Sequence, residues 1–252
     1  MFLNYSHYKN SKPEKWLLIS DSADTGAHNM QKDVMLLDMA ISGDLPLPIL
    51  RFYKFSPAVI TLGHHQKKDP FDFQLLEKDG LELVQRPTGG RAILHDDELT
   101  YSIIVPKGFR LSGQSVPKSY LYISMGLVKA FQNLGLDAKL LPGTRGYIKN
   151  PSCFSSASKF EIACNETKFI GSAQKRKEGA ILQQGSILLG PAYKRIDKYL
   201  PEPTGLEHST SIEELLSSRP SRLELENAII EGLEKVLKIS FIPTKTLNIK
   251  HD

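Results

Sequence analysis

The order in which helix-like and strand-like segments follow one another constrains the fold of this chain most. Apolar residues recur at helical spacing over residues 27–42, and a second helix is expected over 118–134; Gly43 and Gly135 end these two runs. Short strand-like segments fill the rest, without a regular strand–helix–strand alternation. The expected strands are 16–20, 48–55, 58–62, 82–85, 91–94, 99–105, 159–164, 167–171 and 180–189. This order predicts an α+β fold, with helices packed on a mixed, largely antiparallel sheet.

The length of 252 residues suits one large domain, or one domain with a small appendage. Residues 1–15 are a polar N-terminal segment, and residues 16–252 are expected to fold as one domain. The C-terminal part, about 211–240, is expected to be helical, and Ser221 and Glu224 have the spacing of a capping box.

Charge and hydropathy argue against several classes of protein. The net charge of +4 comes from 32 basic and 28 acidic residues, a mild and scattered excess that favours an ordinary solvated surface over nucleic-acid binding. No apolar run approaches the ~18 residues that span a bilayer, and the N-terminus does not resemble a secretory leader. We therefore expect a cytoplasmic protein with no nucleic-acid partner and no membrane contact. A mildly basic face would still help to dock an acidic protein partner.

The segment over residues 85–96 combines paired glycines with two arginines. Gly89 and Gly90 would let the backbone approach a ligand with free N–H groups. Arg86 and Arg91 would add charge-assisted donors for a phosphate or a carboxylate. A Pro-Gly-Gly turn between two strands is also common as a purely structural hairpin, so the pattern alone leaves both interpretations open.

The two cysteines have different surroundings. Neither Cys153 nor Cys164 belongs to a metal-type cluster, so neither a disulfide scaffold nor a metal site is expected. With residues 165–166 as a hairpin turn, period-two alternation puts Cys164 on an apolar strand face, where it is expected to be core. Cys153 stands in a long loop over 141–158 that is rich in Pro, Gly, Ser and Asn. A thiol there could be reached by a substrate.

Lys168 and the small residues after it form a third candidate segment. On the same hairpin, Lys168 falls on the opposite, polar face together with Glu161. A lysine on such a face is usually solvated. The neighbouring Gly171, Ser172 and Ala173 are all small and would leave room for a ligand chain.

Taken together, these segments resemble the lipoate–protein ligase and octanoyltransferase branch of the biotin/lipoate protein ligase superfamily. The family signature Arg-x-x-(Ser/Thr)-Gly-Gly-(Gly/Arg)-Ala-(Val/Ile)-x-His-Asp appears at 86–96. Three further segments resemble motifs of the family. Residues 53–66 resemble its aromatic–Pro–Leu-Gly-x-x-Gln strand pair, and residues 168–174 resemble its Lys-x-x-Gly-Ser-Ala segment. Residues 184–189 have the sequence of its Gln-Gly-Ser-Ile-Leu-Leu strand. The resemblance extends from about residue 16 to residue 200, and the motifs occur in the same order as in the family.

The resemblance implies a class II synthetase-like catalytic domain in which the Gly-Gly hairpin and the lysine strand line an acyl-binding tunnel. Lys168 would contact the acyl carbonyl and stabilise the charge that develops on its oxygen. The resemblance assigns substrate contacts to Arg86, Thr88, Gly89, Gly90, Arg91, His95, Gly171, Ser172 and Ala173.

Two chemistries share this scaffold. A ligase uses ATP and Mg²⁺ to make an acyl-adenylate, whereas an octanoyltransferase takes the acyl group from acyl carrier protein as an enzyme thioester and needs no cofactor. Residues 151–161 look like the cysteine loop of the transferases, which makes Cys153 the expected nucleophile. His95 is the best candidate for a base beside it, although it could equally be structural.

We therefore expect an octanoyltransferase that acylates a lysine of a lipoyl-domain protein or of the glycine cleavage H protein. The alternatives are an ATP-dependent lipoate–protein ligase, an amidotransferase that moves the acyl group between lipoyl proteins, and a non-enzymatic protein that only holds lipoate.

Overall fold

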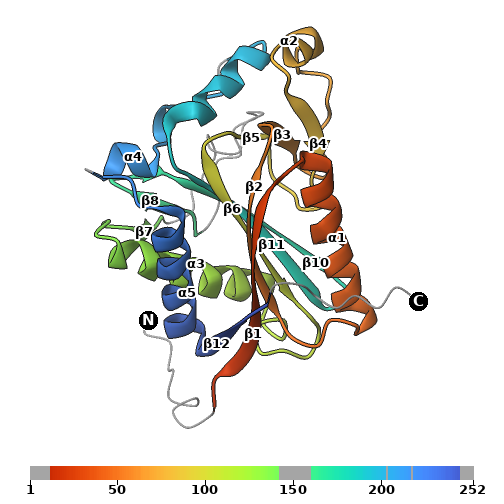
Figure 1. Cartoon of the computed structure of the whole chain (residues 1–252), viewed down its shortest axis with the longest axis vertical. Coiled ribbons are helices and arrows are strands. Elements are labelled where there is room, and N and C mark those ends of the chain that lie inside the picture. Colours follow the sequence, from red (N-terminus) through yellow and green to blue (C-terminus); the bar gives the residue numbers. More distant parts are fainter. Residues whose placement is uncertain (1–11, 142–159, 203, 217, 245–252) are drawn as a thin grey trace.

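The fold is built on a large mixed sheet with helices on both faces and two small sheets beside it (Figure 1). The structure is a computed structural model that describes residues 12–141, 160–202, 204–216 and 218–244. The strands are β1 (Glu14–Asp24), β2 (Ile49–Phe55), β3 (Val59–Leu62), β4 (Glu82–Gln85), β5 (Ile93–His95), β6 (Glu98–Val105), β7 (Lys139–Leu140), β8 (Ile162–Cys164), β9 (Thr167–Lys168), β10 (Ile170–Lys177), β11 (Ala180–Leu188) and β12 (Ile239–Pro243). The helices are α1 (Gly26–Ser42), α2 (Phe73–Lys78), α3 (Val116–Asn133), α4 (Ile212–Leu215), α5 (Arg222–Leu237) and the 3-10 helices η2 (Pro191–Tyr199) and η3 (Leu206–His208).

The large sheet has the strand order β10-β11-β6-β2-β1-β12. Strands β10, β11, β6 and β2 pair antiparallel, whereas β1 is parallel to both β2 and β12. The parallel pair β1–β2 is joined by α1, and the parallel pair β3–β4 of a small sheet is joined by α2. The described residues therefore contain two strand–helix–strand units that the sequence pattern did not reveal. The predicted α+β class, with a mixed and largely antiparallel sheet, is confirmed.

Helices cover the two faces of the large sheet differently (Figure 1). Helix α1 packs on one face, over a small core that includes Leu36, Ile104 and Leu182. Helices α3 and α5 cover the other face, over the main core. These two helices cross closely, because a Cβ on Gly126 would lie 2.6 Å from Cδ2 of Leu233.

The ends of the helices follow the local signals in the sequence. Gly43 and Gly135 have φ values of +94° and +91°, the left-handed conformation that suits glycine after a helix. Ser221 and Glu224 form the expected capping box at the start of α5. The expected helices 27–42 and 118–134 are therefore confirmed to within two residues.

The expected hairpin around the paired glycines is wrong. Strands β4 and β5 do not pair with each other; both lie against β3, in the order β4-β3-β5, with β4 parallel and β5 antiparallel to it. Residues 86–92 therefore cross from one side of β3 to the other. Local turn residues cannot reveal this, because the pairing depends on a strand more than twenty residues earlier in the chain.

The hairpin before Lys168 is confirmed. Strands β8 and β9 pair antiparallel across Asn165 and Glu166, whose φ values of +50° and +64° are those of a tight hairpin turn. The chain then enters the large sheet as β10, its edge strand.

The C-terminal part is helical only up to Leu237, which corrects the expectation of a helical segment to about 240. Strand β12 follows α5 and pairs parallel with β1. In the described residues no helix is long and apolar enough to cross a membrane.

Candidate active site

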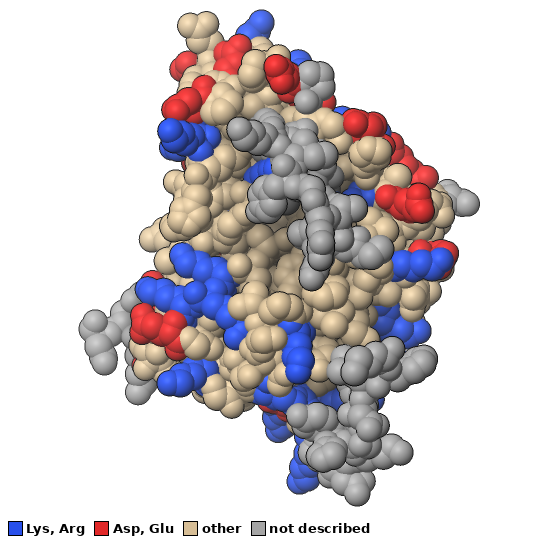
Figure 2. Space-filling view, turned by 180° about the vertical axis from the view of Figure 1, so that it is seen from behind, with Lys and Arg blue, Asp and Glu red and all other residues tan. Residues whose placement is uncertain are grey.

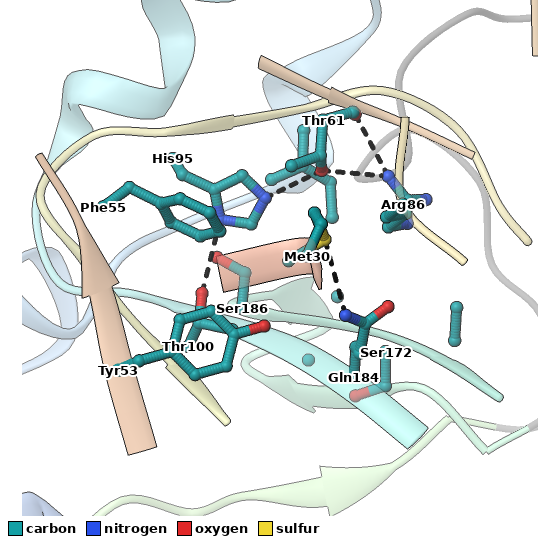
Figure 3. A pocket seen from close by; sticks show the side chains of 14 residues that line it. Met30, Tyr53, Phe55, Thr61, Arg86, His95, Thr100, Ser172, Gln184 and Ser186 are labelled. Atoms are coloured by element: carbon teal, nitrogen blue, oxygen red, sulfur yellow. Dashed lines mark hydrogen bonds between the residues drawn. The ribbon is translucent and has the colours of Figure 1, made fainter. Parts of the chain in front are cut away.

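A narrow pocket that is partly open to the surface lies where α1 and the large sheet meet the small sheet (Figure 3). It brings together five of the predicted site residues, Arg86, His95, Gly171, Ser172 and Ala173. Its other lining residues are Met30, Tyr53, Phe55, Thr61, Ile93, Thr100, Gln184, Gly185 and Ser186. Segments far apart in the sequence therefore line one pocket.

Arg86 holds the paired-glycine segment together. It is 4% exposed. Its Nη1 donates to the carbonyl and the hydroxyl oxygen of Thr61 at 3.0 and 3.1 Å, and its Nη2 donates to the carbonyl oxygens of Gly89 and Arg91 at 2.8 and 2.7 Å. A guanidinium can bridge several acceptors because its donors form a rigid fork. Both terminal nitrogens thus have partners in the protein itself, so a ligand contact by Arg86 stays a prediction.

The glycine segment packs by backbone against the end of β3. A Cβ on Gly63 would lie 1.9 Å from the carbonyl oxygen of Gly90, and Gly90 has a φ of +91°. Gly89 is in open space, because a Cβ there would meet no atom within 4 Å. Thr88 is fully buried and donates from Oγ1 to Oε1 of Gln184 at 2.7 Å. In the described structure this segment adjoins the pocket, but the residues that line the pocket do not include Thr88, Gly89, Gly90 or Arg91.

His95 is buried, and both of its ring nitrogens face hydroxyl groups (Figure 3). Nε2 lies 2.8 Å from Oγ1 of Thr61 and Nδ1 lies 3.3 Å from Oγ1 of Thr100. Thr100 donates its proton to Oε2 of Glu98 at 2.5 Å, so it accepts from Nδ1, which therefore carries a proton. The ring also packs against Phe55, with centroids 4.3 Å apart. These contacts fix the orientation of the imidazole.

A buried carboxylate lies behind the pocket, on the side of α1. Asp33 is 0% exposed, and its carboxylate accepts hydrogen bonds of 2.7–2.9 Å from four side chains: Arg51, Tyr53, Ser102 and Gln184. Burial raises the pKa of Tyr53 well above its usual value, and the charge of Asp33 adds to the rise. Because Gln184 donates to Asp33, its Oε1 is left to accept from Thr88. The network thus anchors the glycine segment.

The sequence did not single out this network. Asp33 occupies a helix position where an acidic residue is ordinarily solvated, and its four partners lie on three other strands. The only signal was the spacing of Asp33 from the apolar positions of α1, which places it on the buried side of the helix.

Lys168 lies on β9, and the sequence left open whether it is solvated or functional. It is 4% exposed, and its Nζ lies 2.8 Å from Oε2 of Glu161, which is also 4% exposed. Lys168 and Glu161 share a strand face, as predicted, and that face is buried. The hairpin is itself packed, so both of its faces are covered. Lys168 is not among the described residues that line the pocket.

The two cysteines can be compared only in part. Cys164 is 4% exposed and belongs to the main core, as predicted. Cys153 lies outside the described residues, so its role as nucleophile and its pairing with His95 stay predictions. Within the described ranges, no group of three or more His, Cys, Asp or Glu side chains is arranged to hold a metal ion.

The sequence has relatives among octanoyltransferases. The chain is 36% identical to octanoyltransferase LipM of Macrococcus caseolyticus, over 91% of this chain and 90% of the relative. It is 37% identical to octanoyltransferase LipM of Bacillus subtilis, over 91% of this chain and 89% of that relative.

Solved structures share the fold. A crystal structure of lipoate-protein ligase A bound with ATP superposes with a TM-score of 0.73 at 24% identity, covering 94% of this chain and 90% of that chain. A putative lipoate protein ligase from T. acidophilum with bound lipoic acid superposes with a TM-score of 0.71 at 23% identity, with the same coverage. Residues 25–234 match the family model of the lipoyl protein ligase A/B catalytic domain. The chain therefore belongs to the lipoyl protein ligase A/B catalytic domain family.

Proposed function

We propose that this protein is an octanoyltransferase that moves an octanoyl group from acyl carrier protein to a lysine of a lipoyl-accepting protein. The observation that carries the proposal is its kinship, at 36–37% identity over nine tenths of the chain, with octanoyltransferases. The acceptor would be a lipoyl-domain protein or the glycine cleavage H protein.

The proposed reaction has two steps. The thiolate of Cys153 attacks the carbonyl carbon of the carrier thioester, the bond to the carrier sulfur breaks, and the carrier thiol takes up a proton. The amine of the acceptor lysine then attacks the enzyme thioester, loses a proton and forms an amide, and the Cys153 thiolate leaves. The first step exchanges one thioester for another, and the second is downhill, so neither requires ATP or another cofactor.

The pocket supports this chemistry. Its small residues Gly171 and Ala173 leave room for an alkyl chain, and Met30, Phe55 and Ile93 add apolar surface. Lys168 would stabilise the charge that develops on the acyl oxygen. On the face shown in Figure 2, basic side chains gather mainly in the lower half and acidic ones near the top, an asymmetry that would orient an acidic carrier.

The test is acyl transfer without ATP. Octanoyl carrier protein, an apo lipoyl domain and the enzyme are mixed, and the mass of the acceptor is followed. We expect the acceptor to gain one octanoyl group. Transfer from free octanoate that requires ATP would instead identify a ligase. Transfer only from an octanoylated lipoyl protein would identify an amidotransferase.

The two cysteines offer a matched control. Cys153→Ser should abolish transfer, because an ester of serine is formed and resolved far more slowly here than a thioester. Cys164→Ala should keep the turnover number, because Cys164 is a core residue. A Cys153→Ser variant that transfers at the wild-type rate would remove the thioester mechanism.

A further inference from the structure

A second buried carboxylate, that of Glu98, lies behind the wall of the pocket. Glu98 is the first residue of β6, is 3% exposed, and is not among the described residues that line the pocket. Its Oε2 accepts from Oγ1 of Thr100 at 2.5 Å and from Oγ of Ser186 at 2.8 Å, and it lies 3.6 Å from Nδ1 of His95. These three neighbours all line the pocket. One carboxylate outside the pocket thus contacts three polar residues of its wall.

A relay of hydrogen bonds connects Glu98 to a positive charge. Within the described ranges no lysine or arginine lies within ion-pair distance of Glu98, and a buried carboxylate is costly unless it is compensated. Nη1 of Arg86 donates to Oγ1 of Thr61 at 3.1 Å, and this oxygen lies 2.8 Å from Nε2 of His95 (Figure 3). Nδ1 of His95 lies 3.3 Å from Oγ1 of Thr100, which donates to Glu98. The imidazole is therefore the middle member of a relay between two charged side chains.

The two ends of the relay fix its direction. A guanidinium can only donate and a carboxylate can only accept, so the protons between Arg86 and Glu98 point toward Glu98. The Thr61 hydroxyl accepts from Arg86, and among the described residues Nε2 of His95 is the acceptor for its proton. Nδ1 of His95 in turn donates to Thr100. The imidazole is therefore neutral, with its proton on Nδ1 and its lone pair on Nε2 already occupied.

The same carboxylate acts on a row of side chains across the large sheet. The strand register places four residues that line the pocket side by side on β10, β11, β6 and β2: Gly171, Ser186, Thr100 and Tyr53. The hydroxyl protons of Ser186 and Thr100 go to Glu98, and that of Tyr53 goes to Asp33 at 2.9 Å. The hydroxyl protons of this row are thus all taken by buried carboxylates. Such a wall suits an alkyl chain, because the chain has no acceptor to offer.

We propose that Glu98 is a positioning residue of the acyl pocket. It takes up the hydroxyl protons of the wall, and through Thr100 it holds His95 as a neutral ring whose Nε2 is occupied. His95 is then a fixed part of the wall against which the acyl chain packs, and it is not the base for Cys153. The inference rests on the proposed acyl transfer and deepens it, because it assigns His95 to chain binding and not to proton transfer.

The first test is the state of the His95 ring, measured by ¹⁵N NMR of the histidine side chains in the full chain without substrate. A His95→Asn variant identifies the signals of this ring by their disappearance. Near neutral pH we expect one protonated ring nitrogen, Nδ1. A ring that is protonated on Nε2, alone or together with Nδ1, would overturn the inference, and this result needs only the wild-type spectrum and the assignment.

Thr100→Val and Ser186→Ala form a matched pair for the role of Glu98. Each variant removes one hydroxyl group that donates to this carboxylate, but only Thr100 also accepts from His95. Thr100→Val should therefore abolish the single Nδ1–H form of the ring, whereas Ser186→Ala should preserve it. A ring that keeps the Nδ1–H form in both variants would contradict the positioning role. A ring that changes equally in both would mean that Glu98 acts only through the general packing of the wall.

Octanoyl transfer distinguishes a residue of the wall from a base. His95→Asn keeps a donor toward Thr100, and His95→Gln keeps an acceptor toward Thr61, so each variant loses one of the two hydrogen bonds of the ring. We expect kcat/KM to fall about tenfold in each, mainly through a higher KM for the acyl donor. Removal of a general base would instead lower kcat about 10²–10⁴-fold in both variants.

The outcomes separate this inference from the proposed function. The state of the ring is measured without substrate, so an Nδ1–H ring in a wild-type enzyme that transfers no octanoyl group would contradict the proposed acyl transfer and leave the relay standing. Normal wild-type transfer, together with a loss of kcat of about 10²-fold or more in both His95→Asn and His95→Gln, would make His95 the base and overturn the inference.

Discussion

The two sides of the pocket use their polar groups in opposite ways. On the side of the small sheet, Arg86 bonds to backbone carbonyl groups, and both ring nitrogens of His95 face hydroxyl groups of the protein. Next to the edge strand β10, beside the residues that line the pocket, Lys168 instead forms a buried ion pair with Glu161. The small-sheet side thus uses its polar groups to hold the backbone and the imidazole in place, whereas the β10 side keeps a buried ammonium that we propose to act on the acyl oxygen.

This difference shows that Arg86, a charged residue of the signature motif, has a structural task of its own. Arg86 shapes the site by holding residues 89–91, and it does so from a buried position. We therefore expect variants on the small-sheet side to act mainly on stability, and variants on the β10 side to act also on turnover.

The largest effect is expected at Lys168. Lys168→Met leaves the Glu161 carboxylate buried without its ammonium partner, which should lower the free energy of unfolding by about 3–5 kcal/mol. Turnover should fall about 10²–10³-fold through the loss of one electrostatic donor. Adding Glu161→Gln should restore most of the stability, measured by urea unfolding, but not the turnover. If the double variant regains turnover as well, Lys168 is structural.

The burial of the Tyr101 phenol should be visible in how the stability of the protein changes at alkaline pH. Its pKa is raised to about 12 in the folded protein, against about 10 when unfolded, so the folded state holds the proton more tightly. The resulting stabilisation is present below pH 10 and is lost as the pH rises from about 10 to 12, a change of about 2–3 kcal/mol. Tyr101→Phe should lose less stability over this range than the wild type. Identical pH profiles would show that the phenol is not buried as described.

A smaller effect is expected at Arg86. In Arg86→Lys a single ammonium cannot bridge Thr61, Gly89 and Arg91 together, so the free energy of unfolding should fall by about 2 kcal/mol. Turnover of the folded enzyme should change far less than in Lys168→Met. An unchanged melting temperature with a raised KM for the acyl donor would instead make Arg86 a ligand contact, and the contrast between the two sides would fail.

The paired glycines give the smallest and most closely matched contrast. Gly90→Ala forces a β-carbon onto a φ of +91°, which should lower the free energy of unfolding by about 1–2 kcal/mol. Gly89→Ala adds a β-carbon in open space and should be nearly neutral. Thermal unfolding of both variants measures the difference. Equal melting temperatures would argue against the described conformation of this segment.

Much of the fold could be predicted where the signal is local. The helix ends at Gly43 and Gly135 and the first turn position at Asn165 depend on residues that adopt a positive φ readily. The family resemblance, read from four motifs in order, is confirmed by the match over 25–234.

What could not be predicted depends on contacts between distant segments. The insertion of β3 between β4 and β5, and the return of β12 to β1, are choices of strand partner that no local pattern encodes. The spacing of Asp33 places it on the buried side of α1, but its four partners are brought together only by the fold. Lys168 looks solvated because period-two alternation identifies the two faces of a strand but not what covers them.

The central claim, acyl transfer through Cys153, is tested most directly by the mass of the intact enzyme after incubation with octanoyl carrier protein alone, without ATP or acceptor. We predict a mass increase of one octanoyl group, located on the peptide that contains Cys153 and released by hydroxylamine. The same increase should appear in Cys164→Ala and be absent in Cys153→Ser. An unmodified wild-type enzyme that still acylates the acceptor, or an octanoyl group that persists in Cys153→Ser, would contradict the account.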